Sequence, residues 1–227
     1  MYYNLNAIIL AREAVRDDDL LVTVYSKERG KLRLQARGAK KIKSKLAGHL
    51  EPVSLSYLNA TMGKRADQLI GAQSNNSYKN IKSNLAATET ALWCLNFLAG
   101  QTFENERDEP IFNLTSKTLD YLEKLVFVDQ AVIASEFTNE RRDPVESARL
   151  YPFPLNDNYF FNLIKVAFGY KLLYLLGHDP SASPDFELKN EIIFLHKNKI
   201  NEILKNGKII NNINQLLEQI NKKKGIE

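Results

Sequence analysis

Residues 30–52 read GKLRLQARGAKKIKSKLAGHLEP, and this stretch decides how the first part of the chain folds. Polar and apolar residues alternate strictly from Lys31 to Arg37, which is the pattern of a β-strand with one face in a protein core. The apolar positions predict a buried face formed by Leu32, Leu34 and Ala36. The opposite face would then present a cationic row, which consists of Lys31, Arg33, Gln35 and Arg37.

A basic loop follows this strand. Gly38 ends the alternation, and four lysines lie within residues 40–45. Glu28 is the only acid between Lys27 and Glu51, whereas residues 27–45 contain nine lysines and arginines. A solvated strand beside a solvated loop is the alternative, but so one-sided a charge favours binding of a polyanion. The candidate phosphate-binding residues are Lys31, Arg33, Arg37, Lys40, Lys41, Lys43 and Lys45.

Four further segments have the composition of strands, namely residues 5–12, 20–25, 53–58 and 68–72. The turn before the cationic strand ends at Gly30, which can take a positive φ. Five strands within about 75 residues, with a longer excursion after the third, predict a Greek-key barrel of the OB type. Periodicity alone leaves an SH3-like barrel open. A short helix or ordered loop at residues 39–48 favours the OB assignment.

Helical spacing replaces the strand pattern after Ser77. We expect one helix up to Gly100, a second that Asp108 caps and that begins near Pro110, and a third at residues 159–176, closed by Gly177. The first of these helices would bury Leu85, Leu92, Leu95 and Leu98, and the second would bury Ile111, Leu114, Thr118, Leu122 and Leu125. The fold class is therefore α+β, with an OB-fold domain at residues 1–77 and an all-α domain at residues 78–227.

Two later segments have weaker patterns. Residues 126–157 contain Pro144, Pro152 and Pro154, and we interpret the segment as a partly ordered insertion. Apolar residues between 209 and 220 predict a short C-terminal helix, and a lysine tail follows it at Lys222, Lys223 and Lys224.

The distribution of charge and cysteine limits the class of protein. Residues 1–76 carry 13 Lys and Arg against 7 Asp and Glu, whereas the remaining residues carry 18 against 20, so the positive field belongs to the first domain. Cys94 is the only cysteine, which predicts a buried thiol and no disulfide or cysteine zinc cluster within the chain. No long apolar run is present, and we expect a soluble cytoplasmic protein without membrane contact.

No motif for covalent chemistry is present. The histidines, His49, His178 and His196, are dispersed, and residues 17–19 are three aspartates that we interpret as a polar turn rather than a metal site. The chain also has no glycine-rich nucleotide-binding motif. We therefore expect a protein that is not an enzyme and that needs no metal or other cofactor.

The opening stretch resembles the bacterial recombination mediator family RecO. The resemblance is carried by the residues around Gly30, by the run at 36–41, by Ser44 to Leu46 and by Leu50 to Pro52. Residues 19–30 also resemble the segment that precedes this signature in the family. The helical part is similar more loosely, mainly through the helices near residues 80–100 and 110–125 and the helix end at residues 171–177.

The resemblance implies a DNA-binding protein of repair and recombination. It would bind single- and double-stranded DNA, anneal complementary strands and help to load recombinase onto single strands coated by single-stranded DNA-binding protein, with RecR as its usual partner. Many family members place a four-cysteine zinc element after the helix that corresponds to residues 159–176. Residues 177–196 contain no cysteine, so we expect that element to be absent.

The first domain has few residues that could stack on bases. No Phe or Trp precedes Trp93, and the tyrosines available are Tyr2, Tyr3, Tyr25 and Tyr57. We therefore expect the nucleic acid to be bound mainly through electrostatic contacts with its phosphates, which leaves the base edges accessible for pairing. Two other functions fit the residues: an OB-domain protein that binds RNA, and an adaptor whose helices bind a protein while the basic stretch is only a solvated surface.

Overall fold

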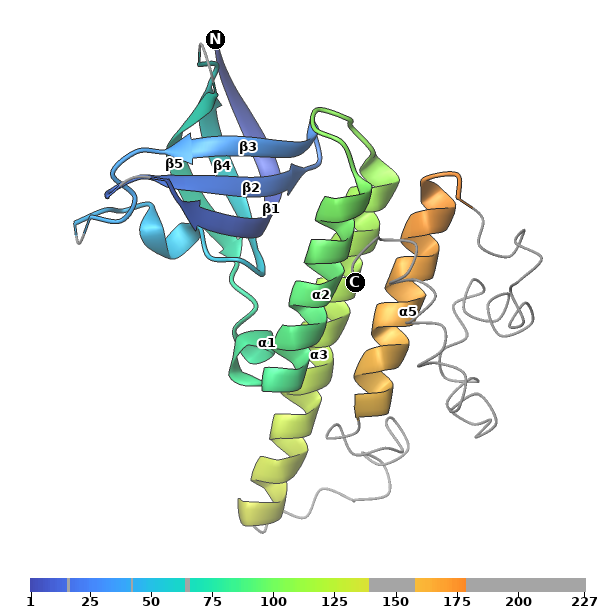
Figure 1. The fold of residues 1–227 in the computed structure, drawn as a ribbon. Coiled ribbons are helices and arrows are strands. Elements are labelled where there is room, and N and C mark those ends of the chain that lie inside the picture. Colours follow the sequence, from blue (N-terminus) through green and yellow to red (C-terminus); the bar gives the residue numbers. More distant parts are fainter. Residues whose placement is uncertain (16, 42, 64–65, 139–157, 179–227) are drawn as a thin grey trace. The chain divides into compact units, whose positions relative to one another are not determined.

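The structure is a computed structural model that describes residues 1–15, 17–41, 43–63, 66–138 and 158–178. In chain order, the described elements are three strands, a 3-10 turn, two further strands and then four helices. Figure 1 shows the strands and helices. The predicted C-terminal helix, the lysine tail and most of the segment expected to lack zinc ligands lie outside the described residues. These three expectations stay predictions.

The five strands form a closed barrel. They are β1 (Tyr2–Ala14), β2 (Leu20–Ser26), β3 (Gly30–Ala36), β4 (Ser54–Thr61) and β5 (Asp67–Asn76). Their order around the barrel is β1-β2-β3-β5-β4, and β1 closes the barrel by pairing with β4 (Figure 1). All neighbours are antiparallel except β3 and β5, which are parallel. This Greek-key order confirms the predicted OB-type fold.

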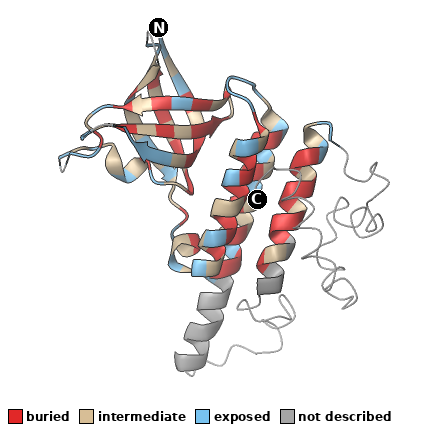
Figure 2. Cartoon of the chain, in the orientation of Figure 1, coloured by how far each residue is buried: buried red, intermediate tan, exposed pale blue. Residues whose placement is uncertain are grey.

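The core of the barrel follows the predicted alternation. In β3, Leu32, Leu34 and Ala36 are buried, whereas Arg33 is exposed and Lys31 is half-buried. Figure 2 shows buried and less buried segments along the strands of the barrel. Burial of a leucine side chain such as Leu32 or Leu34 stabilises the fold by roughly 1.5–3 kcal/mol. The inward-facing residues of the other strands complete the same cluster, which includes Leu5, Ala7, Ile9, Val22, Val24, Leu58, Ala60 and Leu69.

The helices are α1 (Lys79–Ser83), α2 (Leu85–Gln101), α3 (Glu109–Thr138) and α5 (Asn158–Leu175). The Asp108 carboxylate accepts a hydrogen bond from the Ile111 backbone N–H at 3.0 Å, which confirms the predicted N-cap of α3. Gly177, with φ +79°, ends α5 as predicted, because the His178 N–H reaches the Leu173 carbonyl at 2.9 Å.

Two predictions for the helices are wrong in part. Leu85 is 85% exposed, because it is the first residue of α2 and precedes the buried turns that contain Leu95 and Leu98. Residues 126–138, which the sequence pattern predicts to be the start of a partly ordered insertion, continue α3. No glycine or proline interrupts this part of the sequence. Residues 139–157 lie outside the described part of the chain.

The buried face of α3 also differs from the prediction. Ile111, Leu122 and Leu125 are buried as expected, but Leu114 and Thr118 are only half-buried. The buried residues that the prediction did not include on this helix are Phe112, Thr115 and Leu119. On α2, Leu92 is likewise half-buried, whereas Cys94 is buried, as predicted for the thiol.

Contacts divide the chain into two compact units. The first contains residues 1–79 and 91–119, so the barrel belongs together with the end of α2 and the start of α3. The second contains residues 80–90 and 120–227. In the second unit, the Lys165 ammonium of α5 pairs with the Glu89 carboxylate of α2 at 3.1 Å. The predicted domain division after residue 77 stays a prediction.

None of the helices in the described part of the chain is both long enough and apolar enough to cross a membrane.

A substitution at Gly30 tests the contact that joins β3 to the α2–α3 connection. Gly30 has φ +68°, and a Cβ placed on it would lie 1.8 Å from the Glu106 carbonyl oxygen. We expect Gly30→Ala to lower the free energy of unfolding by at least about 2 kcal/mol, because both the backbone and the contact oppose a side chain. Urea unfolding measures the loss.

Gly48→Ala is the matched control, because a Cβ at Gly48 meets nothing within 4 Å. Its stability should stay within about 0.5 kcal/mol of the wild type. Equal effects of the two substitutions would contradict the structural role assigned to Gly30.

Candidate nucleic-acid interface

The basic loop, residues 37–46, is fixed at its base by an aspartate at the start of β2. The Asp19 carboxylate accepts hydrogen bonds from the Gly38 backbone N–H at 2.9 Å and from the Gln35 side-chain amide at 3.2 Å. The Lys40 backbone N–H donates to the Asp18 carbonyl at 3.0 Å. Because Leu20 is opposite Ala36 in the β2–β3 ladder, the aspartates lie beside the end of β3. Two of the three predicted polar-turn aspartates thus anchor the loop.

Contacts with the barrel core hold the chain before and after the lysines of the basic loop. Ala39 and Leu50 are fully buried in the barrel core. A 3-10 turn, η1 (Ala47–His49), precedes Leu50, so the predicted helix or ordered loop at 39–48 is a loop with one short turn. The His49 carbonyl accepts from the Ser56 hydroxyl at 2.9 Å, and its Nδ1 accepts from the Ser74 N–H at 3.2 Å. The lysines therefore lie on a loop fixed at both ends.

Five of the seven predicted phosphate-binding residues are exposed together on this loop: Arg37, Lys40, Lys41, Lys43 and Lys45. The Lys41 ammonium lies 3.6 Å from the Asp18 carboxylate, and both side chains are more than half exposed. Within the described part of the chain, Arg37, Lys40, Lys43 and Lys45 form no ion pair. The loop thus offers to solvent four positive charges that no carboxylate of the described residues pairs with.

Lys31 has a different environment. Its ammonium donates to the Ala99 carbonyl at 2.7 Å and to the Thr102 carbonyl, and both carbonyls lie at the end of α2. Carbonyls at a helix C-terminus carry partial negative charge and have no partner within the helix. Burial lowers the pKa of Lys31, while the neighbouring Glu104 acts in the opposite direction. Lys31 is therefore occupied in a contact within the fold.

Arg33 also has an acidic neighbour. Its guanidinium lies 3.1 Å from the Glu104 carboxylate, on the connection between α2 and α3. The predicted cationic row on β3 is therefore divided. Lys31 and Arg33 face residues 99–104, whereas Arg37 begins the basic loop at the other end of the strand. Phosphate binding by each of the seven residues stays a prediction.

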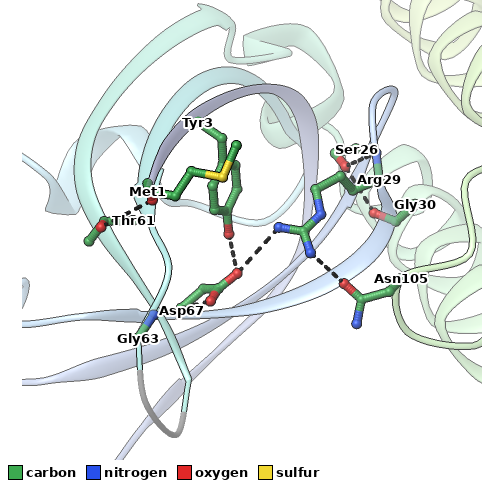
Figure 3. Close-up of polar contacts among 9 residues, drawn as sticks. All are labelled: Met1, Tyr3, Ser26, Arg29, Gly30, Thr61, Gly63, Asp67 and Asn105. Carbon is green, nitrogen blue, oxygen red and sulfur yellow. Dashed lines mark hydrogen bonds and ion pairs between the residues drawn. The ribbon is translucent and has the colours of Figure 1, made fainter.

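One charged cluster was missed by the sequence prediction. Arg29 lies between Asp67, at 3.4 Å, and the Asn105 side-chain oxygen, at 3.1 Å, and its guanidinium covers the Tyr3 ring (Figure 3). The Tyr3 hydroxyl donates to Asp67, and burial and this carboxylate raise the pKa of Tyr3. The partners of Arg29 lie far away in sequence, so no local pattern could indicate them.

The tyrosines offer little surface for base stacking. Tyr25 is buried, and Tyr3 is engaged with Arg29 and Asp67. Tyr2, which is 76% exposed, is the most accessible of the four tyrosines considered for stacking. The described residues thus favour contacts with phosphates over contacts with bases.

Within the described residues, no group of three or more His, Cys, Asp or Glu side chains is arranged to hold a metal ion. Asp19 uses its two carboxylate oxygens for hydrogen bonds to the loop and β3.

Residues 1–78 match the family model described as "Recombination protein O N terminal". Curated relatives named "DNA repair protein RecO" match over longer segments. The relative from Desulforamulus reducens is 31% identical over 117 residues, which cover 52% of this chain and 46% of the relative. The relative from Thermodesulfovibrio yellowstonii is 30% identical over 135 residues, which cover 59% of this chain and 54% of the relative. The relative from Gloeobacter violaceus is 26% identical over 137 residues, which cover 60% of this chain and 51% of the relative.

The matched part of the chain therefore spans about half the length of these curated relatives. The family match covers the whole barrel, including the basic loop. The relatives that match this part of the chain are named for DNA repair.

Substitution of Lys31 separates its contact within the fold from a contact with DNA. Lys31→Met removes the ammonium that donates to two carbonyls and should lower the free energy of unfolding by about 2 kcal/mol. Urea unfolding measures this change, and Lys43→Met is the control, with an expected change of less than about 0.5 kcal/mol. The salt dependence of DNA binding should be unaltered by Lys31→Met. A flatter dependence would mean that Lys31 also binds a phosphate.

Proposed function

We propose that the chain is a RecO-family protein that binds DNA in repair and recombination and holds the phosphate backbone on the loop at residues 37–46; the match of residues 1–78 to the family's N-terminal model supports this. One observation carries the proposal: four exposed cations without ion-pair partners among the described residues lie on one anchored loop. A phosphate can approach each of them without displacing a carboxylate. The loop is therefore suited to contacts that depend on charge and not on base sequence.

The chemistry of the loop suggests how such binding would assist annealing. Lysine and arginine side chains neutralise phosphates, and the strand retains its unoccupied Watson–Crick edges. Two complementary strands held in this way can pair without covalent chemistry. We propose that the protein anneals single strands by this route and acts without enzymatic turnover or a cofactor.

The proposed interface is tested by three substitutions in the loop. Replacing Lys40, Lys43 and Lys45 by Ala removes up to three phosphate contacts, each of which contributes about 0.7 to the slope of log K against log salt on single strands. The slope should become flatter by about 2, with similar losses for all base sequences. Anisotropy of a labelled oligonucleotide, measured over a salt series, gives both quantities.

Three other exposed lysines provide the matched control, namely Lys79, Lys117 and Lys124. Replacing them by Ala makes the same change in net charge, and the slope should change by less than about 0.7, the value for one contact. Wild-type affinity and slope in a folded loop variant would place the DNA surface elsewhere. Competition between DNA and RNA strands distinguishes DNA binding from the alternative of an RNA-binding OB domain, since phosphate contacts do not read the sugar.

We also propose that the helical residues contact protein partners, which family membership suggests are RecR and single-stranded DNA-binding protein. Leu85 and Phe127 support this proposal, because they are large apolar side chains that are 85% and 61% exposed. Replacing each by Ser in the full chain should weaken association with a partner at least fivefold at one of the two positions, while DNA binding is retained. Calorimetry with each partner measures the change. Unaltered affinity in both variants would contradict the assignment of these positions.

A further inference from the structure

An acidic segment, residues 104–109, faces the cations of the β2–β3 hairpin. The Glu104 carboxylate lies 3.1 Å from the Arg33 guanidinium. The Glu109 carboxylate lies 3.1 Å from the Lys27 ammonium, which also lowers the pKa of Glu109. In many OB folds the face formed by strands 2 and 3 binds oligonucleotides. Two cations on this hairpin thus already have carboxylates as partners.

The segment is held in place mainly by contacts other than these ion pairs. The Asn105 backbone N–H donates to the Lys31 carbonyl at 2.9 Å, and the Lys31 ammonium binds the end of α2. The side chains of Arg33 and Glu104 are 60% and 47% exposed, and those of Lys27 and Glu109 are 44% and 40% exposed. Exposed pairs of this kind contribute little to stability. The two glutamates can therefore be neutralised while the segment stays in place.

We propose that Glu104 and Glu109 compete internally with nucleic-acid phosphates, which keeps Arg33 and Lys27 neutralised and confines backbone binding to the loop at residues 37–46. This inference rests on the proposed function. A phosphate oxygen would compete with these carboxylates, which lie 3.1 Å away, for the positive charge of the Arg33 guanidinium and the Lys27 ammonium. The ligand excluded from the hairpin is therefore the backbone of a single-stranded nucleic acid.

Internal competition limits how tightly a strand is held. Each phosphate contact adds about 0.7 to the salt slope on a single strand, so two additional contacts would steepen it by about 1.4. Binding that uses only the loop is weaker and exchanges more readily than binding that also uses the hairpin. Such exchange suits a protein that must release a strand once it has paired.

The test compares wild type with the double variant Glu104→Gln and Glu109→Gln in the full chain. With labelled oligothymidylate as the probe, the slope should steepen by at least about 1.4, and the ratio of binding constants between 50 and 200 mM salt should increase at least about sevenfold, because Glu109 also pairs with Arg107 at 3.5 Å and its neutralisation releases that cation as well. Glu106→Gln is the matched control, because Glu106 lies in the same segment and forms no ion pair within the described residues. It should change the slope by less than about 0.3. A double variant that resembles this control would overturn the proposal.

Arg33 provides a second test that does not depend on the double variant. Arg33→Gln alone should leave the slope unchanged, because Glu104 already neutralises Arg33. The same substitution on a Glu104→Gln background should remove the gain of about 0.7 that Glu104→Gln produces. A slope that is flatter by about 0.7 for Arg33→Gln in the wild-type chain would show that Arg33 binds a phosphate despite Glu104, and the inference would be wrong.

The failure of this inference can be distinguished from that of the proposed function. If the loop variant flattens the slope and the glutamate variants match their control, the loop binds DNA but internal competition is absent. If the loop variant has wild-type binding, the proposed interface itself fails. Thermal unfolding of each variant establishes that the compared proteins are folded.

Discussion

The first unit of the structure depends on the close approach of residues 104–106 to the start of β3. The strand β5 pairs with β3 at only two register positions, Leu34 with Asp67 and Gln35 with Gln68. The same edge of β3 is therefore open near Lys31, where the Asn105 N–H fills it with a hydrogen bond to the Lys31 carbonyl. An unpaired carbonyl at a partly buried strand edge would be costly. The α2–α3 connection thus completes the hydrogen bonding of the barrel.

This approach also divides the cations of the first domain into two groups. Those of the β2–β3 hairpin contact residues 99–109: Lys31 binds helix-end carbonyls, Arg29 binds Asn105, and Arg33 and Lys27 pair with glutamates. The loop that follows β3 lies at the opposite end of the strand and retains its exposed charges. The sequence clusters all these cations within residues 27–45, but the fold gives them different partners.

Local patterns predicted the features that local forces determine. The alternation in residues 31–36 reports the pleat of β3, and the need for a positive φ at Gly30 follows from the turn. The partners of Lys31 and Arg33 could not be predicted in this way, because they lie about 70 residues away and on a connection without periodicity. The extent of α3 differs from the prediction for another reason. The prolines at 144, 152 and 154 lie beyond residues 126–138, which contain no proline and continue the helix.

The anchoring of the basic loop explains why its charge remains accessible. A loop rich in lysine could be fixed by ion pairs, but each pair would neutralise a cation that a phosphate needs. Asp19 instead binds the Gly38 backbone N–H and the Gln35 amide, and the core takes up Ala39 and Leu50. Of the cations on this loop, only Lys41 has a carboxylate partner among the described residues, and this pair is exposed at 3.6 Å. The loop is therefore held by neutral donors and apolar contacts, so that its position is fixed while its positive charge stays available for a phosphate backbone.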